Sequence, residues 1–147
     1  ERFGMTYVDA EGQTKYPYVI HRTSIGCYER TLALLLEKYA GALPTWLMPE
    51  QVRVLPISDR LIDDAKKVEE QLSRAGIRVS CDTRSEKVGY KIREAQLEKI
   101  PYMLVIGDKE VEEGTVSVRS RKEGDLGSMP VESFLSKILQ EIATKAK

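Results

Sequence analysis

The sequence predicts an α/β fold: one domain of about 100 residues, preceded by a hairpin and a helix. After residue 50, apolar strand-like runs alternate with segments of helical period, which favours a parallel sheet with helical crossovers. The run Tyr102–Ile106 is almost wholly apolar, as expected for a strand covered on both faces. Pro44 and Pro49 interrupt the chain just before this alternation begins.

The first segment reads as a hairpin followed by a helix. Two β-prone runs, Arg2–Val8 and Tyr16–Arg22, flank a polar turn that contains Gly12. From Tyr28 the apolar residues fall at helical spacing, and Gly41 is a plausible stop. The prolines at 44 and 49 then mark a rigid connector, so we expect a boundary that divides the chain into residues 1–46 and 47–147.

The second segment begins with a strand, a helix and a second strand. Gln51–Ile57 is the first strand, and Ser58 with Asp59 supplies an N-cap for the helix that follows. One face of that helix is apolar and Gly76 ends it. Ile77–Cys81 is the second strand. The apolar face comprises Leu61, Ile62, Ala65, Val68 and Leu72.

The remaining elements complete the α/β pattern. A helix over Glu86–Lys99, with Val88, Ile92 and Ala95 facing inward, precedes the strand Tyr102–Ile106. The order strand, helix, strand, helix, strand implies right-handed crossovers and a parallel sheet. A charged turn then leads to an antiparallel strand and a last helix that begins near a proline. These are Gly107–Gly114 for the turn, Thr115–Arg119 for the strand, Pro130 for the helix start, and Phe134, Leu135, Ile138, Leu139 and Ile142 for its buried stripe.

Composition excludes several classes of protein. Lys plus Arg and Asp plus Glu both number 23, so any binding of nucleic acid must come from local patterning. No apolar stretch is long enough to cross a bilayer and no signal peptide is evident, so we expect a cytoplasmic protein. Cys27 and Cys81 stand alone, which favours reduced thiols. No glycine-rich loop follows the first strand of the second segment, which argues against a dinucleotide site.

The loop before the first helix contains two candidate functional residues. Arg30 lies in the first turn, where the helix dipole favours anions, so a bound phosphate would explain it; pairing with Glu29 or Glu37 explains it equally well. His21 ends a strand-like run, and a lone histidine is more often structural than a ligand, because zinc needs three or four. A nucleophilic pair of Cys27 with His21 lacks a third, orienting group.

Basic residues gather around the second helix of the α/β segment. This stretch of the sequence has an excess of positive charge, because it contains two acidic residues, Asp82 and Glu86, and five basic ones: Arg78, Arg84, Lys87, Lys91 and Arg93. Lys87, Lys91 and Glu94 share one helix face, which is consistent with a solvated face of paired charges. The loop before this helix leaves the carboxyl edge of the sheet, where open α/β sheets bind ligands, and Asp108-Lys109-Glu110 follows the next strand. Together the two loops could read a flexible polyanion with exposed bases.

The motifs resemble a known family. Residues 21–30, HRTSIGCYER, resemble the third signature motif of class II aminoacyl-tRNA synthetases, and the leading histidine is similar to the threonyl branch. Tyr39-Ala40-Gly41-Ala42 and Pro44-Thr45-Trp46-Leu47 are similar to that family's passage from its catalytic to its anticodon-binding domain. The second domain is similar in order and spacing to the C-terminal domain of bacterial-type threonyl enzymes, through the stretches SEKVGYKIRE (85–94), KIPYM (99–103), GDKE (107–110) and DLGSM (125–129).

The resemblance implies a fold, a function and roles for individual residues. It implies a class IIa anticodon-binding domain, a mixed and mostly parallel sheet flanked by three helices, behind a hairpin-helix remnant of the antiparallel catalytic domain. Arg30 would grip ATP, which acts with Mg, and His21 would be one of three zinc ligands that recognise threonine. The partner would be threonine tRNA, bound by a homodimer in the full-length ligase. The implied anticodon contacts are Lys87, Arg93, Lys99, Lys109, Glu110, Arg119 and, where the family often has Asn, Ser85.

Two readings compete for the function. The first motifs of class II catalysis and the other zinc ligands lie upstream in the family, so we expect this chain alone to be inactive and to hold neither ATP nor zinc tightly. The chain is then the tRNA-reading part of a threonine ligase. The alternative is a stand-alone or accessory tRNA-binding module without catalysis, which has no chemical need of His21 and Arg30.

Overall fold

The computed structural model describes residues 3–146 of the chain, so Arg2 of the predicted hairpin lies outside it. The contacts between residues divide the chain into two compact units, Glu1–Ala33 and Leu34–Lys147. Each unit is described by itself. The division at residues 46 and 47 that the prolines indicate stays a prediction. No helix in the described part of the chain is long and apolar enough to cross a membrane.

The predicted hairpin is present but shorter than expected. Strand β1 (Tyr7–Val8) pairs with β2 (Thr14–Lys15) in antiparallel register, and Asp9 accepts backbone hydrogen bonds across the turn. The second strand was predicted at Tyr16–Arg22, which is wrong: this run has no regular structure, and Tyr18 is 98% exposed. A β-prone run becomes a strand only where a partner supplies the ladder, and residues 3–33 supply none for it.

The predicted first helix is confirmed as α1 (Tyr28–Tyr39). It ends at Gly41, whose φ of 77° lets its N–H donate to the carbonyl of Leu36 at 2.9 Å. No residue of α1 is buried, and Leu32, Leu34 and Leu36 are exposed. Helices this short owe most of their stability to packing, so the apolar side chains of α1 lack the burial that would hold it in water.

The second unit is built on one five-stranded sheet, in the order β4-β3-β5-β6-β7. β4, β3 and β5 pair in parallel, and β5-β6 and β6-β7 are antiparallel, so the predicted mixed sheet is confirmed. The edge strand β7 was not predicted, because its sequence GDLGSMP is polar and rich in glycine. The strands are β3 (Val52–Pro56), β4 (Val79–Cys81), β5 (Tyr102–Ile106), β6 (Thr115–Ser120) and β7 (Gly124–Pro130).

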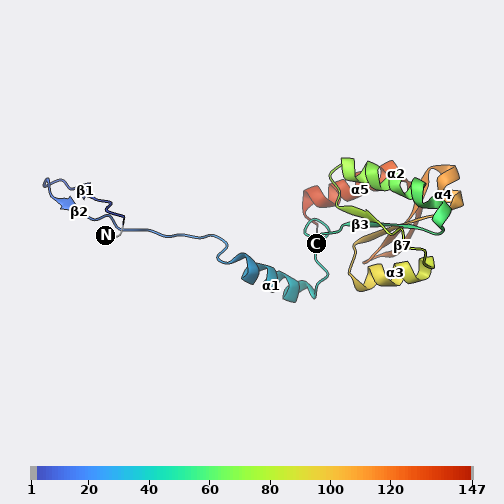
Figure 1. Cartoon of the computed structure of the whole chain (residues 1–147), viewed down its shortest axis with the longest axis horizontal. Helices are drawn as coiled ribbons and strands as arrows, with labels where there is room; N and C mark the ends of the chain where they lie inside the picture. The colour runs from blue at the N-terminus through green and yellow to red at the C-terminus, as the bar shows by residue number, and fades with distance from the viewer. Residues whose placement is uncertain (1–2, 147) are drawn as a thin grey trace. The chain divides into compact units, whose positions relative to one another are not determined.

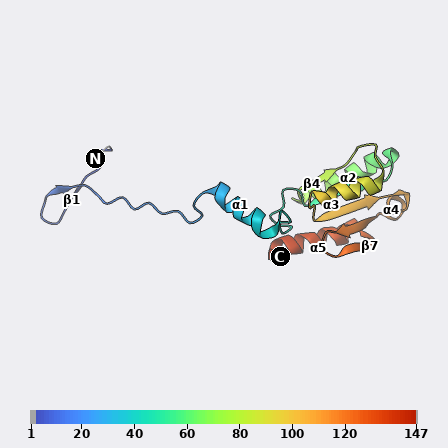
Figure 2. The same cartoon turned by 90° about the horizontal axis from the view of Figure 1, so that it is seen from below.

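Helices cover both faces of this sheet (Figure 1). Helices α2 and α5 lie on one face and α3 lies on the other, and the view in Figure 2 agrees. The predicted turn Gly107–Gly114 is instead a short helix, and the N-cap assigned to Ser58 makes no side-chain hydrogen bond. The helices are α2 (Ile62–Arg74), which follows the 3-10 turn η1 (Asp59–Leu61), α3 (Val88–Leu97), α4 (Asp108–Glu113) and α5 (Val131–Thr144).

Each face of the sheet has its own apolar core. The larger core joins the sheet to α2 and α5, and Phe134 of α5 stands edge-on to Tyr102 of β5 with ring centroids 5.4 Å apart. The smaller core joins Leu55 and Met103 to Ala95 of α3. Val116 and Val118 of β6 belong to the larger core, so the alternating residues Ser117 and Arg119 lie on the α3 side.

The larger core predicts a strong dependence on Phe134, which is 0% exposed. We expect Phe134→Ala to lower the free energy of unfolding by about 3–5 kcal/mol, because it removes a buried ring and leaves a cavity. Leu139→Ala on the same helix is the control, since Leu139 is 39% exposed and should cost well under half as much. Urea denaturation of the two variants measures the difference, and equal losses would contradict this account of the core.

Candidate nucleic-acid interface

The loops after β4, β3 and β5 meet at the carboxyl edge of the sheet, because these three strands are parallel. Side chains link the loops across this edge. Ser85, after β4, donates a hydrogen bond to Asp59, after β3, at 2.8 Å. Arg60 donates to Asp108, after β5, at 2.5 Å. Open α/β sheets bind ligands at such an edge, so two of the predicted contact loops are placed where a ligand is expected.

Most of the basic cluster is already engaged within the protein. The guanidinium of Arg84 grips the buried carboxylate of Asp82 at 2.9 and 2.6 Å and also pairs with Glu94 at 2.6 Å. Hydrogen bonds from Arg84 lower the pKa of Asp82, although its burial opposes the shift. Arg78 donates to the carbonyls of Met48 and Trp46, both at 2.9 Å. Both guanidinium groups thus already make hydrogen bonds within the protein.

Lys91 was predicted to share a solvated helix face with Lys87 and Glu94, and that prediction is wrong. Lys91 is 2% exposed, and its ammonium donates to the carbonyls of Asp82 at 3.0 Å and Pro56 at 3.3 Å. These carbonyls stand at the carboxyl ends of β4 and β3, where the parallel ladder between the two strands has stopped. A charge is tolerated there because it replaces its lost water by carbonyl oxygens.

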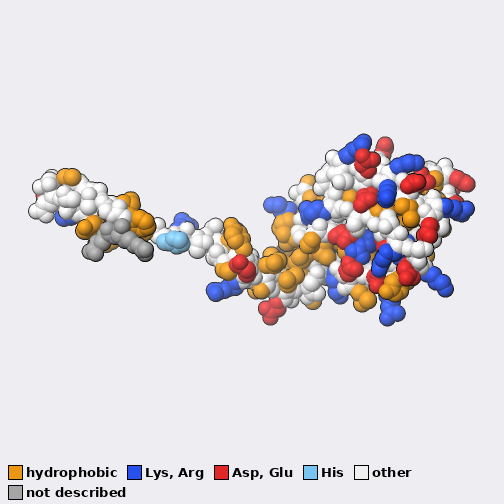
Figure 3. Space-filling view, in the orientation of Figure 1, with side chains coloured by type: hydrophobic (Ala, Val, Ile, Leu, Met, Phe, Trp, Pro, Cys, Tyr) orange, Lys and Arg blue, Asp and Glu red, His pale blue; other side chains and the backbone are white. Residues whose placement is uncertain are grey.

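Lys87 and Arg93 are the members of the basic cluster that remain available. Both are exposed, and neither side chain has a hydrogen-bond or ion-pair partner among residues 3–146. On the face seen in Figure 3, positive and negative side chains of the second unit are interspersed, in keeping with a formal net charge of zero. Contacts to phosphate would therefore depend on a few individual cations rather than on a broad basic patch.

Glu110 is held by hydrogen bonds to both of its carboxylate oxygens. One accepts the N–H of Gly107 at 3.0 Å and thereby caps α4, and the other accepts the hydroxyl of Ser117 on β6 at 2.8 Å. Burial raises the pKa of Glu110, but these hydrogen bonds and the charge of Lys109 outweigh it, so the pKa is lowered overall. Glu110 thus closes the turn after β5 by its hydrogen bond with Gly107. The ammonium of Lys109 lies 3.9 Å from the carboxylate of Glu113.

Gly107 is required by this arrangement. A Cβ added to it would lie 2.8 Å from the carboxylate of Glu110 and 3.1 Å from Ile57. Any larger residue would therefore push Glu110 out of its place.

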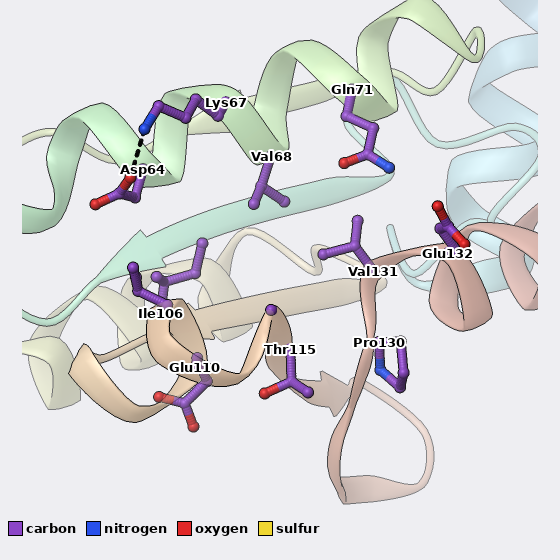
Figure 4. A pocket seen from close by; sticks show the side chains of 12 residues that line it. Asp64, Lys67, Val68, Gln71, Ile106, Glu110, Thr115, Pro130, Val131 and Glu132 are labelled. Carbon is purple, nitrogen blue, oxygen red and sulfur yellow. Dashed lines mark hydrogen bonds and ion pairs between the residues drawn. The ribbon is translucent and has the colours of Figure 1, made fainter.

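Glu110 also lines a pocket of ≈ 460 Å³ on the side of the sheet that α2 and α5 cover (Figure 4). The lining includes three carboxylates, Asp64, Glu110 and Glu132, and one ammonium, Lys67, which is paired with Asp64 at 2.7 Å. A polyanion would be repelled here. The exposed cations without a side-chain partner in the basic cluster, Lys87 and Arg93, do not line this pocket.

Arg119 lies two residues from Ser117 on the same face of β6. Its guanidinium pairs with Asp125 of β7 at 3.2 Å and remains partly exposed. Lys99 lies at the opposite, amino end of β5, where its carbonyl accepts a hydrogen bond from Arg121 at 2.5 Å. The predicted contact residues are thus spread from the carboxyl edge of the sheet, at Ser85 and Glu110, to the amino edge at Lys99.

His21 and Arg30 lie in the first unit, and both are exposed. Arg30 has no ion pair among residues 3–146, and Glu29 accepts a hydrogen bond from the Cys27 thiol at 2.6 Å. No group of three His, Cys, Asp or Glu able to hold a metal occurs among the described residues. One imidazole cannot complete a zinc site, so the residues present do not fit bound zinc.

Comparisons with known proteins decide the family. The family model of the anticodon binding domain matches residues 51–141, more than half of the chain. The chain belongs to this anticodon-binding domain family. The match begins at the residue before β3 and covers all five strands of the sheet. The anticodon-binding fold expected from the sequence is confirmed.

The relatives of this anticodon-binding domain are threonine–tRNA ligases. It is 61% identical to the enzyme of Clostridium perfringens over 145 residues and 57% identical to that of Caldanaerobacter subterraneus over 146. In both cases the match covers 99% of this chain but 23% of the relative. The RNA binding domain of threonyl-tRNA synthetase from Cryptosporidium parvum superposes with a TM-score of 0.78 at 37% identity, over 95% of this chain and 36% of that one. The resemblance to the threonyl enzymes is confirmed.

The domain contains functional candidates that the sequence did not indicate. Asp59 and Asp108 were read as a cap and as part of a charged turn, yet both bridge the loops of the carboxyl edge. Ser117 and Ser128 are candidates because β7 pairs with β6, which places their hydroxyl oxygens 3.0 Å apart. The alternation of polar residues in Thr115–Ser120 was the available signal for Ser117.

The buried ammonium of Lys91 makes a prediction about this edge. We expect Lys91→Met to lower the free energy of unfolding by about 1–3 kcal/mol, because two carbonyls lose their donor in a buried place. Lys87→Met removes the same charge from an exposed position and should change stability by less than about 0.5 kcal/mol. Thermal and urea denaturation measure both. A Lys91→Met protein as stable as the control would show that the ammonium does not hold the edge together.

Proposed function

We propose that this domain reads the anticodon loop of threonine tRNA as part of a longer threonine–tRNA ligase. The chain spans about a quarter of the length of the curated relatives it matches, whose printed name is threonine–tRNA ligase. The observation that carries the proposal is that one sheet edge carries both an available cation, Lys87 in the loop after β4, and a carboxylate held by hydrogen bonds, Glu110 in α4 after β5.

The two kinds of side chain have different tasks. Lys87 and Arg93 contact phosphates, which positions the RNA without reading its sequence. Glu110 cannot do this, because its charge repels phosphate, and it suits the N–H groups of base edges, which are exposed in an unstacked loop. Ser85 donates its hydrogen to Asp59 and so offers base edges only the lone pairs of its oxygen. Further donors come from Lys99 at the amino edge of the sheet, Arg119 on β6 and Lys109 in α4.

The first unit is proposed to belong to the catalytic part of the longer ligase. There Arg30 binds the phosphates of ATP, which acts with Mg, and His21 contributes one of several zinc ligands that this chain does not itself complete. The exposed apolar side chains of this unit, among them Ile25, Tyr28 and Leu32, are consistent with such a role, since they need a surface to pack against. The homodimer that the resemblance implies and the cytoplasmic location expected from the composition are proposed for the longer ligase as well.

Two substitutions separate positioning from reading. We expect Lys87→Ala to weaken binding of every tRNA by similar factors and to reduce the salt slope by roughly one contact, because a phosphate contact carries no sequence information. We expect Glu110→Ala to erode discrimination between the threonine anticodon and swapped anticodons by ~1–3 kcal/mol. Titration of the chain with matched and anticodon-swapped tRNA at two salt concentrations measures both effects.

A control and a contrary outcome complete this test. Lys66→Ala removes an exposed charge from α2, on the other side of the sheet, and should leave affinity unchanged. Equal loss for every anticodon in Glu110→Ala, or no loss at all, would rule out a base-reading role for Glu110.

The proposed division between the two units predicts the catalytic behaviour. The 147 residues alone should show no threonine-dependent exchange of pyrophosphate into ATP, because one arginine and one histidine do not make a catalytic site. In the longer ligase, Arg30→Ala should cost several kcal/mol of transition-state stabilisation, since it removes a charge that grips phosphate. Pyrophosphate exchange measures both proteins, and robust activity of the 147 residues would show that the chain is catalytically complete.

A further inference from the structure

Glu110 is connected through a hydroxyl chain to the edge strand of the sheet. Ser117 on β6 and Ser128 on β7 are directly opposite each other in the antiparallel register. Their hydroxyl oxygens are 3.0 Å apart, and the oxygen of Ser117 is also 2.8 Å from the carboxylate of Glu110. One continuous row of hydrogen bonds therefore runs from Glu110 through Ser117 to the exposed Ser128.

Counting protons fixes the direction of this row. An ionised carboxylate only accepts, so the single hydrogen of Ser117 goes to Glu110. Ser117 then has no hydrogen left for Ser128, so the contact between the two serines is made by the hydroxyl of Ser128. Ser128 thus spends its own hydrogen on Ser117 and presents only lone pairs to the solvent. No group in the row keeps a hydrogen that it could donate to a ligand.

The row is also held in place from both ends. The second oxygen of Glu110 accepts the N–H of Gly107, so its carboxylate is fixed against both α4 and β6. On β7, the carboxylate of Asp125 accepts the N–H of Gly127 at 2.9 Å and pairs with Arg119 on β6. The strand that carries Ser128 is therefore tied to β6 by a side-chain pair as well as by the ladder.

We propose that Ser117 and Ser128 are positioning residues for base reading: Ser117 orients the carboxylate of Glu110, and Ser128 commits the hydrogen of Ser117 to that carboxylate. This inference rests on the proposed function and adds a specificity rule to it. A row that offers acceptors and no donors favours a base edge that presents N–H groups and disfavours one that presents carbonyl or ring-nitrogen acceptors.

The orienting role explains why a charged side chain can discriminate at all. A free glutamate rotates about its side-chain bonds and can follow whichever base is presented to it. A glutamate held by two donors keeps its remaining lone pairs in fixed directions, so a wrong base edge would leave these acceptors unpaired in the complex, and that cost supplies the specificity.

Four variants test the inference. In Ser117→Ala, discrimination between matched and swapped anticodons should fall about tenfold, the usual weight of one hydrogen bond to a charged group. Ser117→Thr keeps the hydroxyl and should restore discrimination to within about threefold of the unaltered chain. Ser128→Ala frees the hydrogen of Ser117 to rotate and should reduce discrimination by a smaller factor, about threefold. Glu110→Ala sets the full loss for comparison.

The measurement is titration of the chain with the matched and swapped tRNAs at two salt concentrations, with melting temperature as a check on folding. The salt slope should stay the same in all four variants, because none of these side chains contacts phosphate. Ser128 is exposed on an edge strand, so Ser128→Ala keeps the test decisive if Ser117→Ala does not fold.

The outcomes separate the inference from the function on which it rests. Discrimination lost in Glu110→Ala but kept in both serine-to-alanine variants would overturn the inference alone. A loss in Ser117→Ala that Ser117→Thr does not rescue would also overturn it, because the hydroxyl would then be irrelevant. An unaltered chain that does not distinguish the two tRNAs would overturn the proposed function and the inference together.

Discussion

The carboxyl edge of the sheet depends on a buried charge. Parallel strands leave unpaired carbonyls where their ladder ends, and at β3 and β4 two of these carbonyls accept from the ammonium of Lys91. The loop that carries Ser85 and Lys87 starts at one of these strand ends, and the turn that carries Asp59 starts at the other. Because Lys91 belongs to α3, it also fixes the helix against the edge from which these loops emerge.

With this edge fixed, the neighbouring charges divide into those that build the site and those left over for a ligand. Arg84 satisfies Asp82 and Glu94, and Arg60 satisfies Asp108. Each such pair occupies a cation that a count of basic residues in the sequence would treat as free to bind a ligand. The candidate interface therefore offers a few free groups at defined positions, which suits the recognition of a loop of RNA better than nonspecific attraction to a polyanion.

The sequence predicts the architecture well because apolar periodicity survives in every core element. It predicts Tyr102–Ile106 to the residue, and the inward faces of α2 and α5 nearly so. It fails for β7 and Lys91, where a tertiary partner outweighs local pattern. β7 has the composition of a loop but finds the ladder of β6, and Lys91 occupies a helix position that looks solvated but reaches strand-end carbonyls.

The candidate site was predictable as a set of residue types, but its geometry was not. Glu110 could be recognised as a carboxylate at a sheet edge; its orientation depends on Gly107 and Ser117, which lie three residues before it and seven after it. No periodicity encodes such a contact, because it arises from the packing of α4 against β6.

A single guanidinium links the far end of the candidate interface to the connector before the domain. Arg121 donates to the carbonyl of Lys99, and the same side chain donates to the carbonyls of Leu43 at 2.7 Å and Ala42 at 3.2 Å. Lys99 has a φ of 63°, an unfavourable conformation for a side chain other than glycine, and the bond from Arg121 helps to hold its carbonyl in that place. A shift of Lys99 toward a ligand would strain this bond. The carbonyls of Lys99, Leu43 and Ala42 thus share one donor side chain, Arg121.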